Sequence, residues 1–582
     1  MTEARSDNAR PSEPWRQRLI RNLLYGGNVD RAAKARARVG FAILAFAAVY
    51  AIIGGRLVMY AVGADSHSAR HSVSQDAIAT ARPDIIDRNG EILATDVKAP
   101  SLFAEPRRII DKDEAIELLT ATLPDLDVAE VRERLSSKKG FVWLKREITP
   151  QQQQDIHRQG IPGIGFLREN KRVYPDGNEV AHLIGLVNID NQGIAGMEKW
   201  LDNNGLADLH RAGFATDRLQ RPVELAVDLR VEHALRDELE KAKAKFHAKA
   251  ASGLVENVNT GEVIAMVSLP DFDPNNPREA HDPDRINRLT TGVYEMGSTF
   301  KAFTLAMALD SGKYDLNSMW DARGPLHYGR FTIHDDEPKG RFLSMKEVFT
   351  YSSNVGAARI ALAQGVEAHK AFLRKMGQLD RLRTELPESA MPIVPKHWGD
   401  LNTITIAFGH GIAVAPLQAV MGVSALTNGG LLIPPTFLKR TEEQARAIAK
   451  RVIKPETSEK MRFLMRLNAV VGTARKADVN GYYIGGKTGT AEKVIKGRYA
   501  KKRVLTAFTA IIPADKPRYQ LLIMLDEPQP LKETHGFITS GWNAVPTAGN
   551  VIMRIAPLLD IAPRFDLPPP ERLILAASSP TQ

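Results

Sequence analysis

The sequence predicts an α+β protein held in a membrane by one N-terminal helix, with a β-rich module followed by a larger domain. Three observations favour this fold class: an uncharged apolar run near the N-terminus, short strand-like runs between about 81 and 225, and two strand hairpins that bracket a helical stretch after that. The 582 residues leave room for about three or four domains. The absence of cysteine from the sequence excludes disulfides, thiol catalysis and zinc sites with cysteine ligands.

The first element is a candidate membrane span. Val39 to Gly55 contains 17 residues without a charge, which as a helix cover about 26 Å. The apolar stretch continues past Arg56 to Ala64 and then covers about 36 Å, enough to cross a bilayer. We therefore expect a tail over 1–38, a transmembrane helix over 39–62 and a linker over 63–80.

The alternative for this segment is a cleaved signal peptide, since Val62, Gly63 and Ala64 are small enough for a cleavage site. A leading tail of 38 residues and so long an apolar run favour the uncleaved anchor.

The charge distribution gives the expected orientation. The first 38 residues hold nine Arg or Lys and four Asp or Glu, a net charge of +5, which is half of the chain's +10. A basic segment before the span predicts a cytoplasmic N-terminus and an exported body. The body is nearly balanced in charge, so the composition does not indicate a nucleic-acid surface.

The module over 81–225 is predicted to be a non-catalytic pedestal. Asn89-Gly90, between DIIDR and EILA, is a hairpin signal, and FVWLKREI over 141–148 is a candidate strand.

The domain over 226–560 is predicted to contain one central antiparallel sheet flanked by helices. It begins with a helix (LRVEHALRDELEKAKAKFHAKA) and the hairpin SGLVENV-NTGE-VIAMVSL, and it ends with a second hairpin over 503–527. Between the hairpins, 300–312 and 346–365 each have a helical pattern closed by a glycine. Strands at both ends with helices between them favour one shared sheet. The tail over 561–582 is rich in proline and serine and is expected to be flexible.

Three short motifs in this domain carry candidate chemistry: Ser298-Thr299-Phe300-Lys301, Ser352-Ser353-Asn354 and Lys487-Thr488-Gly489-Thr490. A serine hydroxyl is a weak nucleophile unless a base lies within hydrogen-bond reach. Lys301 follows Ser298 by one helical turn and so lies on the same face. The run around it is apolar on nearly all sides, and burial lowers the pKa of a lysine, which can then act as a base. A serine at a helix start also has backbone N–H groups nearby that can stabilise an oxyanion.

Each motif alone is a weak signal. Ser136 to Lys139 also fits S-x-x-K and Ser6 to Asn8 fits S-D-N, and we interpret both as chance matches. The weight comes from three motifs in order within one predicted domain, a set typical of penicillin-binding proteins and class A β-lactamases.

From about 80 to 555 the chain resembles the class B penicillin-binding proteins, which are peptidoglycan D,D-transpeptidases. The likeness includes NTGEVIAMVSLPDFDPNN, GHGIAVAPLQ and GGKTGTAEK around the motifs, and RVYPDGNEVAHLIGLVN and GIAGMEKWLD in the pedestal. Within the family, VWLKRE, the compact pedestal and the length are most similar to the cell-division type, penicillin-binding protein 3 (FtsI type).

The resemblance implies a role for each motif residue. Ser298 would attack the carbonyl between the two terminal D-alanines of a stem peptide, with Lys301 taking its proton. Ser352 would relay a proton to the leaving amine, Asn354 would orient the lysine and the substrate amide, and Lys487 would supply positive potential. The substrate-binding residues would be Thr488, Gly489 and Thr490.

The resemblance also implies the setting. The partners would be stem peptides, glycan strands made from a lipid-linked precursor, β-lactams, division-site membrane proteins and a partner glycosyltransferase. The protein would sit in the inner membrane at the septum, with its catalytic domain in the periplasm. No H-E-x-x-H motif occurs in the sequence, so neither a metal nor a cofactor is expected, and His410, between two glycines, is expected to serve a turn near the site. An elongation-type transpeptidase is the main alternative, and a D,D-carboxypeptidase or β-lactamase-like protein is less favoured.

Overall fold

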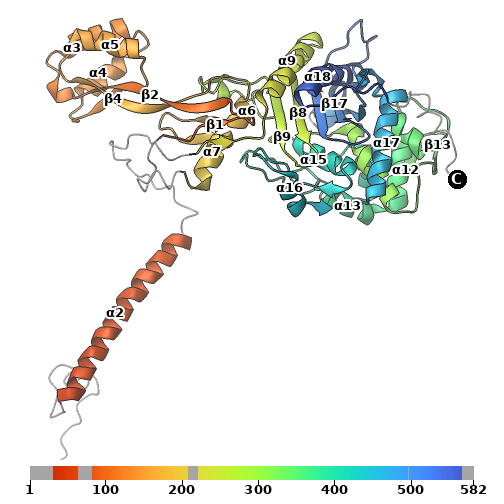
Figure 1. The fold of residues 1–582 in the computed structure, drawn as a ribbon, viewed down its shortest axis with the longest axis horizontal. Coiled ribbons are helices and arrows are strands. Elements are labelled where there is room, and N and C mark those ends of the chain that lie inside the picture. The colour runs from red at the N-terminus through yellow and green to blue at the C-terminus, as the bar shows by residue number, and fades with distance from the viewer. Residues whose placement is uncertain (1–30, 63–80, 207–220, 496, 567–582) are drawn as a thin grey trace, which may run out of the picture. The chain divides into compact units, whose positions relative to one another are not determined.

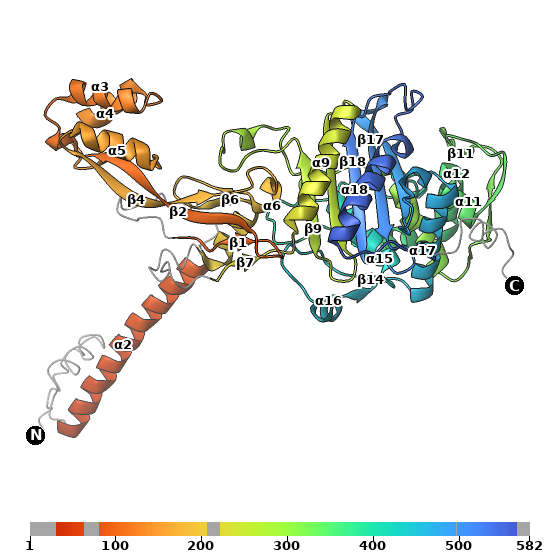
Figure 2. The same ribbon diagram turned by 45° about the horizontal axis from the view of Figure 1, so that its top comes forward.

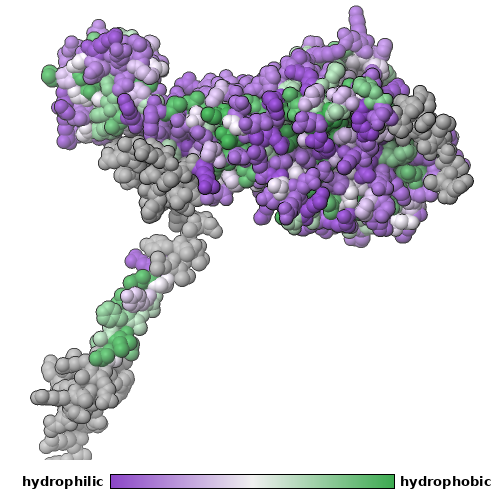
Figure 3. Space-filling view, in the orientation of Figure 1, coloured by the Kyte–Doolittle hydropathy of each residue, from purple (hydrophilic) through white to green (hydrophobic). Residues whose placement is uncertain are grey.

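The computed structural model describes residues 31–62, 81–206, 221–495 and 497–566, and the chain divides into two units, Met1–Ala77 and Ile78–Gln582. In the first unit, helix α2 covers Arg31–Val62 (Figure 1). Its window Val39–Arg56 has a mean hydropathy of 1.8 and none of it is buried, and its apolar residues appear green in Figure 3. This helix is long and apolar enough to cross a membrane, which suggests a single-pass anchor. The expected linker over 63–80 lies outside the described residues.

The helix begins at Arg31, eight residues before the expected span. The preceding residues RAAKARAR are strong helix formers, so the same helix extends through the basic segment.

The pedestal is built on a sheet in the order β3-β2-β1-β7, with β4 also paired to β2. The strands are β1 (Ile85–Ile86), β2 (Ile92–Ala104), β3 (Val142–Lys145), β4 (Ile164–Val173) and β7 (Val223–Glu224). Gly90 has φ +95°, which a glycine adopts without strain, in the turn that joins β1 to β2. The expected hairpin at Asn89-Gly90 is therefore confirmed, and β7 pairs in parallel with β1.

Three helices pack at the far end of β2 and β4: α3 (Lys112–Thr122), α4 (Val128–Ser136) and α5 (Pro150–Gln159). The sequence analysis, which predicted a strand-rich pedestal, did not predict them. The 3-10 turn η2 (Pro106–Arg108) follows β2 beside these helices. The base of the pedestal holds α6 (Ala181–Ile184), β5 (Leu186–Val187), β6 (Gly193–Ala195), α7 (Gly196–Leu201) and the π-helical turn η3 (Asp202–Leu206).

The larger domain contains one five-stranded antiparallel sheet in the order β16-β17-β18-β8-β9. The strands are β8 (Ala250–Asn257), β9 (Val263–Leu269), β16 (Gly485–Ile495), β17 (Arg498–Ile512) and β18 (Tyr519–Asp526). Leu522 of β18 lies opposite Leu254 of β8, so the hairpins from the two ends of the domain meet in one sheet. This confirms the expected topology.

Helices cover both faces of this sheet (Figure 2). One face packs against α9 (Leu229–Lys245) and α18 (Ala544–Leu558), and the other against α10 (Lys301–Asp310), α11 (Met345–Thr350), α12 (Asn354–Gln364), α15 (Pro416–Thr427) and α17 (Pro455–Val471). Successive strand residues alternate between the two cores: Leu254 and Leu522 belong to one, Val255 and Ile523 to the other. The strands are thus buried on both sides, which fits their nearly continuous apolar sequence.

The larger domain also contains several shorter elements in the part of the chain that the structure describes. They are η4 (Glu279–His281), η5 (Gly297–Phe300), β10 (Met319–Ala322), β11 (Leu326–Tyr328), β12 (Phe331–Ile333), β13 (Arg341–Ser344), α13 (Val366–Lys375), α14 (Asp400–Ile406), β14 (Leu431–Leu432), α16 (Glu442–Ile448), β15 (Lys450–Arg451), η6 (Arg475–Ala477) and η7 (Ser540–Trp542).

Candidate active site

Ser298 lies in the 3-10 turn η5, immediately before α10. Gly297 has φ +51°, and a Cβ there would come within 2.5 Å of the Thr490 carbonyl oxygen. Only a glycine fits so close to strand β16 in that conformation. The turn therefore sets Ser298 directly against the strand that carries the K-T-G motif.

Lys301, the first residue of α10, is fully buried. Its Nζ lies 2.9 Å from Ser298 Oγ, 3.1 Å from Ser352 Oγ and 2.7 Å from Asn354 Oδ1, and it also donates to the Ser352 carbonyl. Burial lowers the pKa of Lys301 to about 7, because a charged amine loses its hydration inside the protein. An uncharged amine beside a serine hydroxyl can accept its proton near neutral pH.

The S-S-N motif lies at a corner between two helices, so the helical pattern over 346–365 corresponds to two helices joined at this motif. Helix α11 ends at Thr350 and α12 begins at Asn354, while Ser352 has φ +56°. Ser353 caps α12 by accepting the N–H of Gly356 at 2.9 Å. Serine side chains compete with helical backbone bonds in this way, which breaks the pattern that the apolar spacing suggested.

Lys487 lies on β16 and is also fully buried. Its Nζ lies 3.0 Å from Ser352 Oγ and donates to the Thr488 carbonyl at 3.0 Å. Burial lowers the pKa of Lys487 well below its usual value, and the charge of Lys301 lowers it further. One hydroxyl, that of Ser352, thus lies between two buried amines.

Thr488, Gly489 and Thr490 lie on β16, an edge strand of the sheet. A Cβ on Gly489 would come within 2.5 Å of the Met296 carbonyl oxygen, so strand and nucleophile turn are in direct backbone contact. Because an edge strand has unpaired backbone groups, an extended peptide could pair with it beside Ser298.

Two residues that sequence analysis missed support this strand, Thr473 by its side chain and Ser540 by its backbone. Thr473 Oγ1 lies 2.7 Å from Thr488 Oγ1, and the Ser540 N–H donates to Thr490 Oγ1 at 3.2 Å. Neither residue belongs to a motif, and only the fold brings them to β16.

The comparisons with known proteins agree with this geometry. Residues 251–540 match the penicillin-binding protein transpeptidase domain, and residues 77–204 match the penicillin-binding protein dimerisation domain. The chain is 39% identical over 497 residues to the probable peptidoglycan D,D-transpeptidase FtsI of Caulobacter vibrioides, with 84% of this chain and 83% of that protein covered. The chain belongs to the penicillin-binding protein family.

Other relatives of this penicillin-binding protein include the peptidoglycan D,D-transpeptidase FtsI of Escherichia coli, 30% identical over 525 residues, with 84% of this chain and 86% of that protein covered. The fold of the present chain is similar to that in the crystal structure of penicillin-binding protein 3 of Mycobacterium tuberculosis, complexed with aztreonam. The TM-score is 0.64 at 24% identity, with 85% of this chain and 98% of that chain covered.

Of the two chance motif matches in this penicillin-binding protein, only Ser136 to Lys139 lies in the described part of the chain, and it belongs to the pedestal. Ser136 ends α4 in the pedestal and Lys139 is exposed there, while residues 6–8 lie outside the described part of the chain. His410 packs edge-on against Tyr499 with ring centres 5.4 Å apart, and burial lowers its pKa to about 4, with a smaller contribution from Lys301. Among the described residues, no group of three or more His, Cys, Asp or Glu could hold a metal ion.

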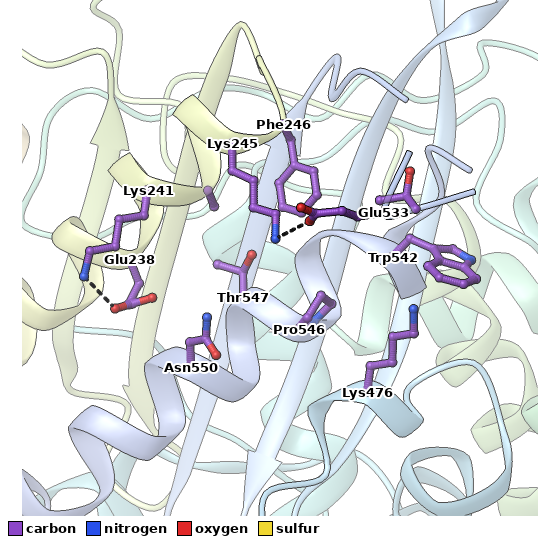
Figure 4. Close-up of a pocket in the computed structure, with 12 residues that line it drawn as sticks. Glu238, Lys241, Lys245, Phe246, Lys476, Glu533, Trp542, Pro546, Thr547 and Asn550 are labelled. Atoms are coloured by element: carbon purple, nitrogen blue, oxygen red, sulfur yellow. Dashed lines mark hydrogen bonds and ion pairs between the residues drawn. The ribbon is translucent and has the colours of Figure 1, made fainter. Parts of the chain in front are cut away.

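A separate hollow of about 290 Å³ lies between α9 and α18 (Figure 4). The Lys245–Glu533 ion pair, 2.9 Å long, lies at this hollow, and Trp542 and Asn550 also line it. None of the motif residues lines this hollow, so it is separate from the candidate active site.

Proposed function

We propose that this protein is a peptidoglycan D,D-transpeptidase that cross-links stem peptides of the septal wall during cell division, through a serine acyl-enzyme. The observation that carries the proposal is an unbroken series of contacts, none longer than 3.1 Å, from Ser298 through Lys301 and Ser352 to Lys487. It links a nucleophile, a base of lowered pKa and a hydroxyl that can pass protons.

In the first step, Ser298 Oγ attacks the carbonyl between the two terminal D-alanines and passes its proton to Lys301 Nζ. The backbone N–H groups of Ser298 and Thr490 stabilise the oxyanion, since Gly297 brings that turn against β16. The C–N bond then breaks, and the D-alanine amine takes this proton from Lys301 Nζ by way of the Ser352 hydroxyl, which leaves Lys301 uncharged again. The product is an ester between the stem peptide and Ser298.

In the second step, an amine from a neighbouring stem peptide attacks this ester. Lys301 accepts the proton of the amine and returns one to Ser298 as the C–O bond breaks. Attack by water instead would give a carboxypeptidase. A β-lactam acylates Ser298 in the same way and stays attached.

The rest of the site binds the donor peptide. Lys487 supplies positive potential from inside the sheet edge, Thr488 and Thr490 bind the terminal carboxylate, and Gly489 between them completes the substrate-binding segment. The free edge of β16 supports this placement, because it can pair with an extended peptide.

We assign domains as 1–38 cytoplasmic tail, 39–62 transmembrane helix, 63–80 linker, 81–225 pedestal, 226–560 transpeptidase domain and 561–582 tail. The pairing of β7 with β1 supports a boundary near 225, because β7 completes the pedestal sheet. In this arrangement the catalytic domain is periplasmic, and the helix and pedestal bind division-site membrane proteins and a partner glycosyltransferase.

The first experiment tests the acyl-enzyme. The full chain in detergent is incubated with penicillin and weighed by mass spectrometry. We expect a gain of one penicilloyl group, on the peptide that holds Ser298, and no gain for Ser298→Ala. Labelling that survives this substitution would refute the assignment.

The second experiment tests the septal role. Depletion should block septation while growth continues and give filamentous or branched cells, and a tagged copy should gather at the division site. Rounded cells with side-wall labelling would instead indicate the elongation role, and the proposed chemistry would be unaffected.

A further inference from the structure

The corner that carries Ser352 and Asn354 is held by a segment outside all three motifs. Asp335 Oδ2 accepts the hydroxyl of Ser353 at 2.7 Å, and Asp335 Oδ1 accepts the N–H of Val355 at 2.9 Å. The carbonyl of His334 accepts Asn354 Nδ2 at 3.0 Å. Two neighbouring residues thus hold three consecutive residues of the corner.

These bonds hold the backbone next to Ser352, which is itself in a strained conformation. Ser352 is in the left-handed region, where a residue other than glycine persists only when its surroundings hold it. The Asp335 carboxylate lies at the N-terminus of α12, an 11-residue helix, where a negative charge is favourable. Ser353 is buried and has both of its roles filled, since it donates to Asp335 and accepts from Gly356.

The same segment fixes the direction of the Asn354 amide. Because Asn354 Nδ2 donates to His334, the Oδ1 atom is left for Lys301, which it meets at 2.7 Å. A rotated amide would place Nδ2 against the protonated amine, two donors facing each other, or would occupy the lone pair that the uncharged amine needs for the serine proton.

The charge of Asp335 also reaches the base. Burial is the largest influence on the pKa of Lys301 and lowers it, whereas the negative charge of Asp335, and to a smaller extent that of Asp336, raises it. The other titratable groups facing Lys301 are Lys487 from β16 and His410 from the loop before α15, and the charge of Lys301 lowers the pKa of both.

We propose that Asp335 is a positioning residue of this active site: its carboxylate holds Ser352 and Asn354 where they contact Lys301. The inference rests on the acyl-transfer function proposed above. Asp336 provides a matched control, because it is the adjacent aspartate and has no hydrogen bond to α12 in the described part of the chain.

The test compares Asp335→Asn, Asp335→Ala and Asp336→Asn with the unchanged protein, each as the full chain in detergent. The rate constant for acylation by labelled penicillin is measured from about pH 5 to about pH 9. We expect Asp335→Ala to lower the plateau about 10- to 100-fold, because small misplacements of reacting groups cost that much. Asp335→Asn should lower it about tenfold, because an amide has one acceptor oxygen and so cannot accept from both the Ser353 hydroxyl and the Val355 N–H.

The pH profile separates positioning from a general loss of structure. Both Asp335→Asn and Asp336→Asn remove a negative charge that favours protonated Lys301, so the acidic limb should move to lower pH in both, further for Asp335→Asn. Asp336→Asn should keep its plateau.

If the plateau of Asp335→Asn equals that of Asp336→Asn, the inference is overturned. If Asp335→Ala does not fold, Asp335→Asn, which has nearly the same shape, decides. Failure of the unchanged protein to acylate at Ser298 would instead refute the proposed function, so the two failures are distinguishable.

Discussion

At the scale of single residues, the site depends on two buried amines that share one hydroxyl. Lys301 and Lys487 are both fully buried, and both contact Ser352 Oγ. Two positive charges this close in a desolvated site are unfavourable, so burial and mutual repulsion favour a site with at least one uncharged amine. In the proposed mechanism, the uncharged amine is the base that accepts the Ser298 proton.

The protonation state of Lys301 predicts how the acylation rate depends on pH. Lys301 must be uncharged to accept the serine proton, and its pKa is about 7. The acylation rate constant should therefore rise about tenfold per pH unit below pH about 7 and level off above it. Stopped-flow measurement with a chromogenic cephalosporin would follow this limb, and a flat profile down to pH about 5 would contradict it.

A substitution pair controls that experiment. Lys301→Ala should lower the plateau by about 100- to 10,000-fold, as loss of a general base does. Lys139→Ala, in the exposed chance match to S-x-x-K, should leave both the plateau and the acidic limb of the acylation profile unchanged.

At the scale of elements, a buried ion network joins three parts of the pedestal. Glu198 in α7 pairs with Arg82, which precedes β1, at 2.7 Å, and with Arg172 of β4 at 2.6 Å, and all three side chains have 0% exposure. Asp202 and Asp96 complete the network. The network therefore ties α7 and the segment before β1 to the strands of the pedestal sheet.

We predict that Glu198→Ala lowers the free energy of unfolding by about 3–5 kcal/mol, because two buried guanidinium groups lose a partner. Urea unfolding of the full chain in detergent, followed by circular dichroism, measures the change. Glu442→Ala, which removes the exposed ion pair with Arg446, should cost less than about 1 kcal/mol. Equal effects of the two substitutions would mean that the buried network contributes little.

At the scale of the whole molecule, the chain combines a helix that can cross a membrane with a pedestal and a catalytic domain that extend well beyond the site. An enzyme with a single-pass anchor can act only within reach of the membrane, and its pedestal offers surface that the chemistry does not need. The same active site could serve division or elongation, so we propose that this surface and the anchor select the place of action.

The anchor predicts a topology. A reporter that is active only outside the cytoplasm should work when fused after residue 80 and fail when fused before residue 38, because the basic segment stays inside. Activity of the reporter fused before residue 38 would show that the orientation is the opposite of the one predicted. A mature protein that begins near Asp65 would show a cleaved signal instead.

The sequence by itself determined the features that depend on local spacing. Lys301 follows Ser298 by one turn, the apolar run around it predicts its burial, and both outer hairpins are evident from their turns. The caps Asp111, Asp127 and Thr149 of the three pedestal helices are also visible in the sequence, but those helices are short and were missed among strand-like neighbours.

Only the tertiary structure decided how distant segments meet. The left-handed Ser352 breaks an apparently helical pattern because Asp335 and His334 hold the next three residues, and no local spacing encodes that contact. Thr473 and Ser540 reach β16 in the same way. A motif gives the type of each side chain, whereas its position and pKa follow from burial and from partners that are far away along the chain.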